Sequence, residues 1–216
     1  MKKIIFKNMA NLVVLIRSLM IFLVIYFFKV PSLRTRVWGL IFLILVALLD
    51  WLDGYIARKC KIESKIGALM DTLGDRLTEN LLCIFFAYMR LIPLFMPLVF
   101  VARSFVADFI RYQSFTSGTS TFSINKSKLG MMLVASRPSR VLYLVSKIAV
   151  FFLAGMVLVL ESAIITYSLD LHIYLTNLSQ FVYYMAEFVV LFNIIRFILL
   201  IYDSRHVLKE SFGKRK

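Results

Sequence analysis

The chain has 216 residues, of which 61% are hydrophobic and 18% are charged. Because soluble domains are only about half apolar, this composition predicts one polytopic membrane domain over residues 1–216, with no room for a second large domain. The net charge of +14 comes from basic residues at the ends of apolar segments, which favours anionic membrane surfaces and anionic substrates as partners and argues against nucleic acid. Two cysteines outside any CxxC motif exclude a disulfide framework, and two histidines argue against a zinc or haem site.

The N-terminal residues 1–9 (MKKIIFKNM) are basic and partly apolar, which predicts a short amphipathic helix on the membrane surface. No small-x-small cleavage site follows, so we expect this segment to remain in the mature protein. The first predicted transmembrane helix covers residues 11–28 and contains Arg17. Two interpretations of Arg17 stand equal: a side chain that snorkels to the interface, or one that contacts a phosphate.

Five more apolar segments predict transmembrane helices over residues 37–58, 66–89, 91–112, 141–160 and 181–202. The expected fold is therefore all-α, with about six transmembrane helices. The N-terminus, the loop 113–140 and the C-terminal tail 203–216 are rich in lysine and arginine, which predicts that they face the cytoplasm. Residues 161–180 contain no lysine or arginine and are expected to form an outer loop. The outer loop 29–36 does not fit this rule, because it contains Lys29, Arg34 and Arg36.

Residues 50–75 (DWLDGYIARKCKIESKIGALMDTLGD) place four aspartates between apolar flanks. On a helix, Asp50 and Asp53 share one face with Gly54, Ala57 and Arg58, and Gly67, Asp71 and Asp75 share one face of the next helix. A polar break over residues 59–65 supplies a bend, so the two helices can direct four carboxylates to one point. Such carboxylates repel one another unless a cation holds them, and oxygen ligands alone suit Mg²⁺ or Mn²⁺.

This stretch resembles the signature of the class-I CDP-alcohol phosphatidyltransferases, D-x2-D-G-x2-A-R-x8-G-x3-D-x3-D, at all eight fixed positions. Two polar helix ends at a membrane surface are the weaker interpretation, because intramembrane carboxylates are costly and usually functional. The resemblance implies metal-dependent transfer of a phosphatidyl group from CDP-diacylglycerol to a small alcohol, with release of CMP, in phospholipid biosynthesis. It also implies a multi-pass protein of the bacterial inner membrane, a cytoplasmic active site and a homodimer.

The resemblance assigns roles to the signature residues. It implies that Asp50, Asp53 and Asp71 bind the metal, and that Asp75 is the general base and touches a second ion. The residues it implies for CDP-lipid binding are Asn11, Asp53, Gly54, Ala57, Arg58 and Gly67. Glycine and alanine suit that role because they let the nucleotide approach the backbone closely.

Weaker resemblances indicate which alcohol is the acceptor. Residues 11–17 (NLVVLIR) and the spacing of Arg103, Arg111 and Gly118 resemble phosphatidylglycerophosphate synthases, and residues 125–128 (NKSK) do so loosely. The motif RPSR at residues 137–140 instead resembles phosphatidylinositol-phosphate synthases. Both accept a phosphorylated alcohol, and glycerol 3-phosphate is the best prediction. The residues expected to bind its phosphate are Arg103, Arg111, Lys126, Lys128, Arg137 and Arg140; a merely solvated basic loop is the alternative.

Two other classes of function are compatible with carboxylates in a membrane protein. A cation-coupled transporter would use intramembrane carboxylates too, but no inverted repeat or broken helix pair is visible. A non-catalytic scaffold is disfavoured because no signature aspartate is missing.

In the fourth predicted transmembrane helix, Asp108 and Arg111 lie three residues apart and can neutralise each other. In the last predicted transmembrane helix, Glu187, Asn193 and Arg196 are as well explained by interhelical hydrogen bonds as by catalysis.

Overall fold

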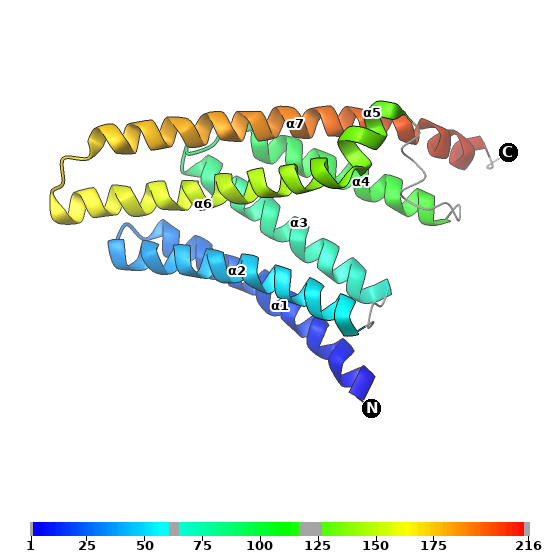
Figure 1. The fold of residues 1–216 in the computed structure, drawn as a ribbon, viewed down its shortest axis with the longest axis horizontal. Coiled ribbons are helices and arrows are strands. Elements are labelled where there is room, and N and C mark those ends of the chain that lie inside the picture. Colours follow the sequence, from blue (N-terminus) through cyan, green and yellow to red (C-terminus); the bar gives the residue numbers. More distant parts are fainter. Residues whose placement is uncertain (1, 61–64, 117–126, 214–216) are drawn as a thin grey trace. The chain divides into compact units, whose positions relative to one another are not determined.

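The computed structural model describes residues 2–60, 65–116 and 127–213, and the side chains within 15–50, 71–110, 127–134 and 136–205 apart from Lys128. The described residues are helical, without strands, which confirms the all-α prediction. Figure 1 shows the α-helices α1 to α7 in chain order. Their bounds, with one π-helical segment η2, are α1 Lys2–Lys29, α2 Leu33–Cys60, α3 Lys65–Tyr88, α4 Phe95–Thr116, α5 Lys128–Gly130, η2 Met131–Ala135, α6 Arg137–Tyr167 and α7 His172–Gly213.

Two of the long helices end in the same way. Arg90 follows α3 with φ 59°, and Ser168 follows α6 with φ 51°. After each, a leucine amide donates back across the last turn, from Leu91 to the carbonyl of Phe86 (3.0 Å) and from Leu169 to that of Ile164 (3.2 Å). A left-handed residue with this hydrogen bond is a common helix C-terminus, so both ends are set by local backbone geometry.

Several predicted boundaries are wrong. A separate surface helix over residues 1–9 does not form, because α1 runs without a break from Lys2 to Lys29. Most of the predicted outer loop 161–180 is helical, since α6 continues to Tyr167 and α7 begins at His172. A lack of lysine and arginine indicates which side of the membrane a segment faces, but it does not distinguish a loop from the continuation of a helix. Glu161 of α6 pairs with the buried Arg36 of α2, as described below.

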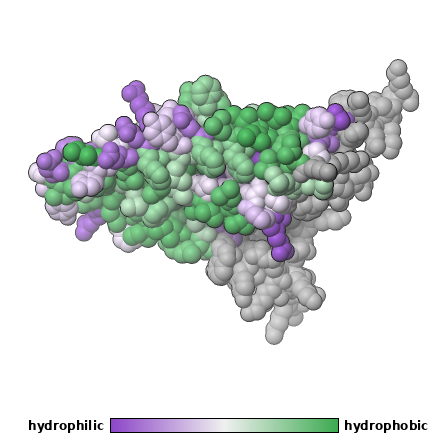
Figure 2. All heavy atoms as spheres, turned by 45° about the horizontal axis from the view of Figure 1, so that its top comes forward, coloured by the Kyte–Doolittle hydropathy of each residue, from purple (hydrophilic) through white to green (hydrophobic). Residues whose placement is uncertain are grey.

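Two helices in the described part of the chain are long and apolar enough to cross a membrane, Arg137–Tyr167 and His172–Arg205. Large apolar side chains are exposed along them, among them Val141, Phe181 and Leu191. Figure 2 shows apolar residues covering much of the visible described surface. Exposed apolar area of this extent indicates a membrane environment. The prediction of six transmembrane helices remains a prediction.

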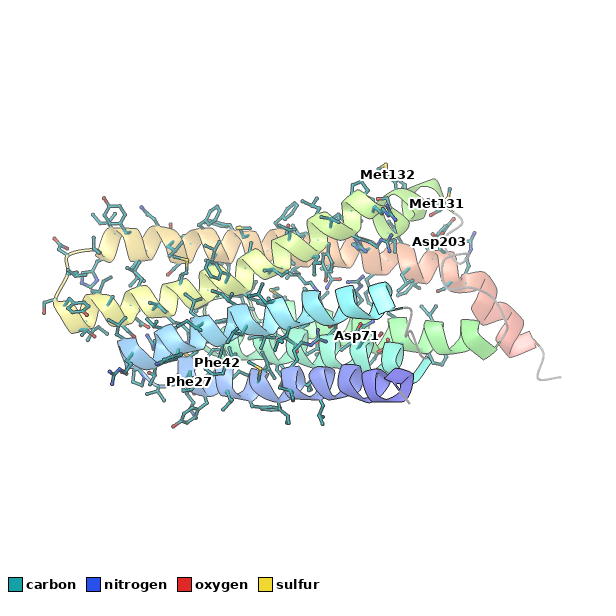
Figure 3. The ribbon with its side chains drawn as sticks, turned by 60° about the horizontal axis from the view of Figure 1, so that its bottom comes forward. Phe27, Phe42, Asp71, Met131, Met132 and Asp203 are labelled. Atoms are coloured by element: carbon teal, nitrogen blue, oxygen red, sulfur yellow. The ribbon has the colours of Figure 1, made fainter. Side chains whose placement is uncertain are left out.

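The chain divides into two compact units, which we describe separately: Met1–Leu91 with Phe151–Val182, and Ile92–Val150 with Tyr183–Lys216. In the first unit α1 packs against α2 and α3. Phe27 of α1 and Phe42 of α2 meet with ring centroids 5.4 Å apart (Figure 3). The ring of Phe28 is buried, and its centroid lies 5.9 Å from the ring centroid of Phe86 on α3.

Phe28 also explains two glycines. A Cβ atom on Gly39 of α2 would lie 3.0 Å from the Phe28 ring, and one on Gly155 of α6 would lie 2.8 Å from it. Both distances are below ordinary van der Waals contact. The two glycines therefore let α2 and α6 approach a large aromatic ring, as small residues do where helices pack in membranes.

In the same unit, Arg36 of the predicted outer loop 29–36 is paired with a carboxylate. Arg36 is 5% exposed and donates hydrogen bonds to the Leu158 carbonyl (2.8 Å) and to Oε2 of Glu161 (2.6 Å). Because its charge is buried and paired, Arg36 does not act as a free positive charge in the folded protein. The misfit with the charge rule is therefore smaller than the sequence indicated.

The second unit has an aromatic centre at Tyr143 of α6. The centroid of its ring lies 6.3 Å from the ring centroid of Phe100 on α4 and 6.1 Å from that of Phe192 on α7. Hydrogen bonds of Ser127, the residue before α5, connect the start of α5 to α7. Ser127 donates through Oγ to the buried Asp203 (2.9 Å) and accepts from the Gly130 amide (2.9 Å). Figure 3 shows Asp203 on α7 near Met131 and Met132 of η2.

Candidate active site

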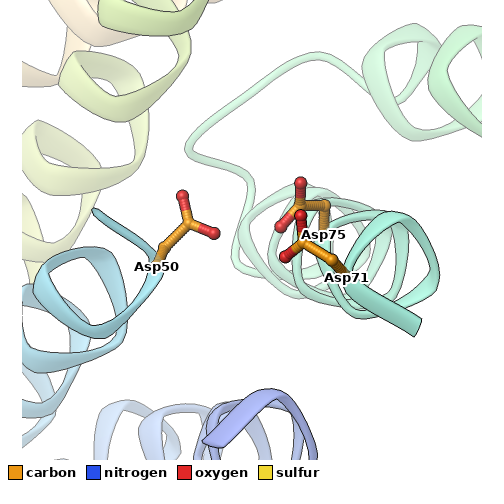
Figure 4. Close-up of side chains that lie close together, drawn as sticks. All are labelled: Asp50, Asp71 and Asp75. Carbon is orange, nitrogen blue, oxygen red and sulfur yellow. The ribbon is translucent and has the colours of Figure 1, made fainter. Parts of the chain in front are cut away.

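Three of the four signature carboxylates come together in the first unit. Asp50 lies on α2, and Asp71 and Asp75 lie one turn apart on α3. One oxygen from each lies within 4.8 Å of the others, and Figure 4 shows Asp50 facing the two aspartates of α3. The side chains are about half exposed, at 46% for Asp50, 48% for Asp71 and 52% for Asp75. A ligand can therefore reach them from one side.

Arg17 of α1 closes the other side of this cluster. Its side chain is only 2% exposed, and its Nη1 forms an ion pair with Asp50. Its Nη2 lies 2.8 Å from Asp75 and 3.4 Å from Asp71. The interpretation that Arg17 snorkels to the interface is therefore wrong, because the guanidinium is buried against carboxylates. These contacts give no support to the phosphate interpretation.

The donor set fits a hard cation. Carboxylate oxygens gathered without nitrogen or sulfur ligands are what Mg²⁺ and Mn²⁺ prefer, so the three aspartates could bind a divalent metal ion. Among the described contacts, three carboxylates meet the one guanidinium of Arg17. A bound divalent cation would lower the repulsion among these carboxylates.

The remaining signature positions are placed only by their helices. Asp53, Gly54, Ala57 and Arg58 lie on α2, Gly67 lies on α3 and Asn11 lies on α1. Their side chains lie outside the described part of the structure, as do residues 61–64 of the predicted bend. The roles assigned to them thus stay predictions.

The second unit contains a separate basic cluster around Tyr143. Arg103 of α4 donates to Oδ1 of Asn193 (2.6 Å) and to the Tyr143 hydroxyl (3.1 Å). Arg196 of α7 donates to Oγ and the carbonyl oxygen of Ser139, at 3.1 and 3.3 Å. Both guanidinium groups lie over the Tyr143 ring, 5.2 and 5.0 Å from its centroid. Cation–π contacts and hydrogen bonds hold two like charges close together here.

Two arginines expected at a phosphate site belong to this neighbourhood. Arg103 is in the cluster itself, and Arg140 is close enough for its charge to act on Arg196. Arg137 is exposed at the start of α6. The side chains of Arg111, Lys126 and Lys128 lie outside the described residues.

Sequence reasoning did not assign Arg196 to the site. The signal for it was an arginine in an apolar helix, since intramembrane charges usually mark functional positions. Within the described residues, two of the cluster's buried donor atoms, Nε of Arg196 and Nδ2 of Asn193, have no hydrogen-bond partner. Buried donors usually have one, so the hydrogen-bonding capacity of this cluster is not fully used.

Comparison with known proteins places the chain in a family. The profile of CDP-alcohol phosphatidyltransferases matches residues 7–190. The CDP-diacylglycerol–glycerol-3-phosphate 3-phosphatidyltransferase of Rickettsia bellii is 25% identical over 147 residues, 64% of this chain and 81% of that protein. The enzyme of the same name from Bacillus subtilis is 33% identical over 73 residues, only 34% of this chain and 38% of that protein. A putative cardiolipin synthase of Mycobacterium tuberculosis is 32% identical over 78 residues, 36% of this chain and 37% of that protein. The chain therefore belongs to the CDP-alcohol phosphatidyltransferase family, as the signature at residues 50–75 predicted.

Proposed function

We propose that this chain transfers a phosphatidyl group from CDP-diacylglycerol to glycerol 3-phosphate, giving phosphatidylglycerophosphate and CMP in phospholipid biosynthesis. The observation that carries the proposal is the gathering of Asp50, Asp71 and Asp75 from two helices at signature positions. Family membership supports the reaction class, and relatives named as glycerol-3-phosphate 3-phosphatidyltransferases support the acceptor.

The proposed metal site consists of Asp50, Asp53, Asp71 and Asp75, with Mg²⁺ or Mn²⁺ as the ion. When bound, a divalent ion neutralises the pyrophosphate oxygens of the CDP-lipid and polarises the phosphorus. We assign the general-base role to Asp75, whose half-exposed carboxylate can take the proton from the acceptor hydroxyl. The acceptor oxygen then forms the new P–O bond to the lipid phosphate, and the P–O bond to the departing CMP breaks.

For the CDP-lipid, the proposed contacts follow the signature. Asp53, Gly54, Ala57 and Arg58 share one helix, α2, with Gly67 on α3 and Asn11 on α1. The small residues leave the backbone accessible to the nucleotide, and the Arg58 guanidinium suits a phosphate.

For the acceptor, the basic cluster of the second unit supports a phosphorylated alcohol. Arg103 and Arg196, held over Tyr143 with Arg140 nearby, provide the forked donors that bind a phosphate dianion well. Arg111, Lys126, Lys128 and Arg137 are the further proposed contacts. The motif at residues 137–140 keeps inositol 1-phosphate as the second candidate acceptor.

The proposed setting is a multi-pass protein of the bacterial inner membrane, with six transmembrane helices and a cytoplasmic active site. The two apolar helices and the family support a membrane location. A homodimer is proposed from the resemblance to the family.

A transfer assay tests the proposed function. Purified protein in detergent would receive CDP-diacylglycerol with radiolabelled glycerol 3-phosphate, inositol 1-phosphate, serine, inositol or choline, each in separate reactions. We expect Mg²⁺- or Mn²⁺-dependent lipid labelling with glycerol 3-phosphate and its loss in EDTA. Preference for inositol 1-phosphate would correct the acceptor alone. Preference for an uncharged alcohol would contradict the phosphate-binding role of the basic cluster.

A further inference from the structure

Arg17 contacts three carboxylates of the candidate site. A single buried guanidinium meets three carboxylates carried by two other helices, Asp50 of α2 and Asp71 and Asp75 of α3. In each case the atom it contacts is Oδ1. Each carboxylate also carries a second oxygen, and about half of each aspartate side chain is exposed. Arg17 thus approaches the cluster from its buried side.

The Arg17 guanidinium reduces the electrostatic repulsion among the three aspartates. Carboxylates with oxygens within 4.8 Å of one another repel strongly where water is partly excluded. Without an internal cation, α2 and α3 would be pushed apart whenever no metal is bound. One guanidinium relieves part of this repulsion, and its fork can contact several carboxylates at once.

We propose that Arg17 is a built-in counter-ion that positions the three carboxylates for the metal, an inference that rests on the metal site of the proposed function. It keeps Asp50, Asp71 and Asp75 together before the ion arrives and leaves their exposed side for the ion. It also moderates metal affinity, because it cancels one of the negative charges that attract the cation. Arg17 is a positioning residue and does not touch the substrate.

The test measures thermal unfolding of the full chain in detergent, in EDTA and in saturating Mn²⁺, at one scan rate. In EDTA, Arg17→Gln should lower Tm by about 5 °C or more, because the carboxylates lose their counter-ion. Mn²⁺ should restore most of this loss, so that the metal-induced rise in Tm is larger than in the unmodified protein. The half-maximal rise should need about tenfold less Mn²⁺. Arg17→Lys should fall between the two.

Arg36→Gln is the matched control. Arg36 is also a buried arginine of the first unit that pairs with a carboxylate, Glu161. Its loss should lower Tm equally in EDTA and in Mn²⁺. If Arg17→Gln behaves like Arg36→Gln, Arg17 serves only packing and the inference is wrong.

A double variant separates this inference from the proposed metal site. In EDTA, Arg17→Gln/Asp50→Asn should be more stable than Arg17→Gln, because one repelling charge is removed. If Mn²⁺ does not stabilise the unmodified protein, the metal site is wrong, and the double variant still decides the role of Arg17. A double variant no more stable than Arg17→Gln would overturn the counter-ion role.

Discussion

At the level of single residues, the setting of a carboxylate decides what it can do. Asp50, Asp71 and Asp75 share a small volume above a buried guanidinium. Asp170, in contrast, is an exposed acid in the short connection between α6 and α7. A bound cation would relieve the repulsion among the three clustered carboxylates, whereas the exposed Asp170 carboxylate is stabilised by water.

The first prediction follows from this contrast. Asp50→Asn and Asp71→Asn should each reduce CMP release by about a hundredfold or more, because each removes charge that the metal needs. Chelation of the unmodified protein should have the same effect. The measurement is CMP release at several Mn²⁺ concentrations, with Asp170→Asn as the control of unchanged activity. Normal turnover of Asp71→Asn would contradict the site.

The second prediction concerns the basic cluster. Arg103→Ala removes donors to Asn193 and Tyr143 from the proposed acceptor site. A charge-assisted contact contributes roughly 1.5–3 kcal/mol, so the KM for glycerol 3-phosphate should rise about ten- to a hundredfold. The KM for CDP-diacylglycerol should stay unchanged. Initial rates with both substrates varied provide the measurement, and Arg34→Ala, at an exposed arginine of α2, is the control. An effect on both KM values would show a structural role instead.

The residues of the carboxylate cluster were predictable because their spacing is local. Helical periodicity places Asp71 and Asp75 on one face of α3, and the structure brings Asp50 of α2 close to them, as the signature spacing predicted. Arg17 and Arg196 were not assigned for the opposite reason. Their partners lie 54 and 57 residues away at Asp71 and Ser139, and no local pattern records which distant helix an arginine will meet.

At the level of helices, packing in the first unit depends on one aromatic ring and two glycines. Phe28 of α1 lies against Gly39 of α2 and Gly155 of α6. The length of the apolar segments predicted these helices, because segments long enough to cross a membrane are expected to be helical. The predicted end of α3 lies within one residue of Tyr88, but α6 was predicted to end at residue 160 and continues to Tyr167. Arg90 and Ser168 terminate helices in a conformation usually taken by glycine, so neither end carries the usual sequence signal.

The third prediction tests this contact. Gly155→Val should destabilise the protein by roughly 1–3 kcal/mol, because its added atoms meet the Phe28 ring. For a chain of this size that corresponds to a fall in Tm of about 2–4 °C per kcal/mol. Adding Phe28→Leu should recover part of the loss. Ala102→Val, at an exposed position of α4, is the control and should change Tm little. Equal stability of both valine variants would contradict the packing role.

At the level of the whole molecule, the orientation of the chain in the membrane is testable by labelling. If six helices span the membrane, the α1–α2 and α6–α7 connections face outwards and the end of α7 faces the cytoplasm. Single cysteines would be placed at Ser32, Asp170 and Lys209 after replacing Cys60. Cys83 is fully buried and should give little background.

The fourth prediction is the labelling pattern. Ser32→Cys and Asp170→Cys should react with a membrane-impermeant maleimide in intact cells, whereas Lys209→Cys should react only after permeabilisation. Protein labelled at Asp170→Cys but not at Ser32→Cys would contradict six spans, while leaving the two apolar helices α6 and α7 in place.

The ion pair between the buried Arg36 and the part-exposed Glu161 has a consequence for biosynthesis. The two residues are 125 positions apart, so the ribosome completes the α1–α2 hairpin long before the acidic partner exists. During that interval burial of Arg36 would leave an uncompensated charge, which is strongly unfavourable. We therefore expect Arg36 to stay hydrated in the nascent hairpin until the end of α6 emerges. Closing this pair is a late step of maturation, and a chain truncated before Glu161 cannot complete the first unit.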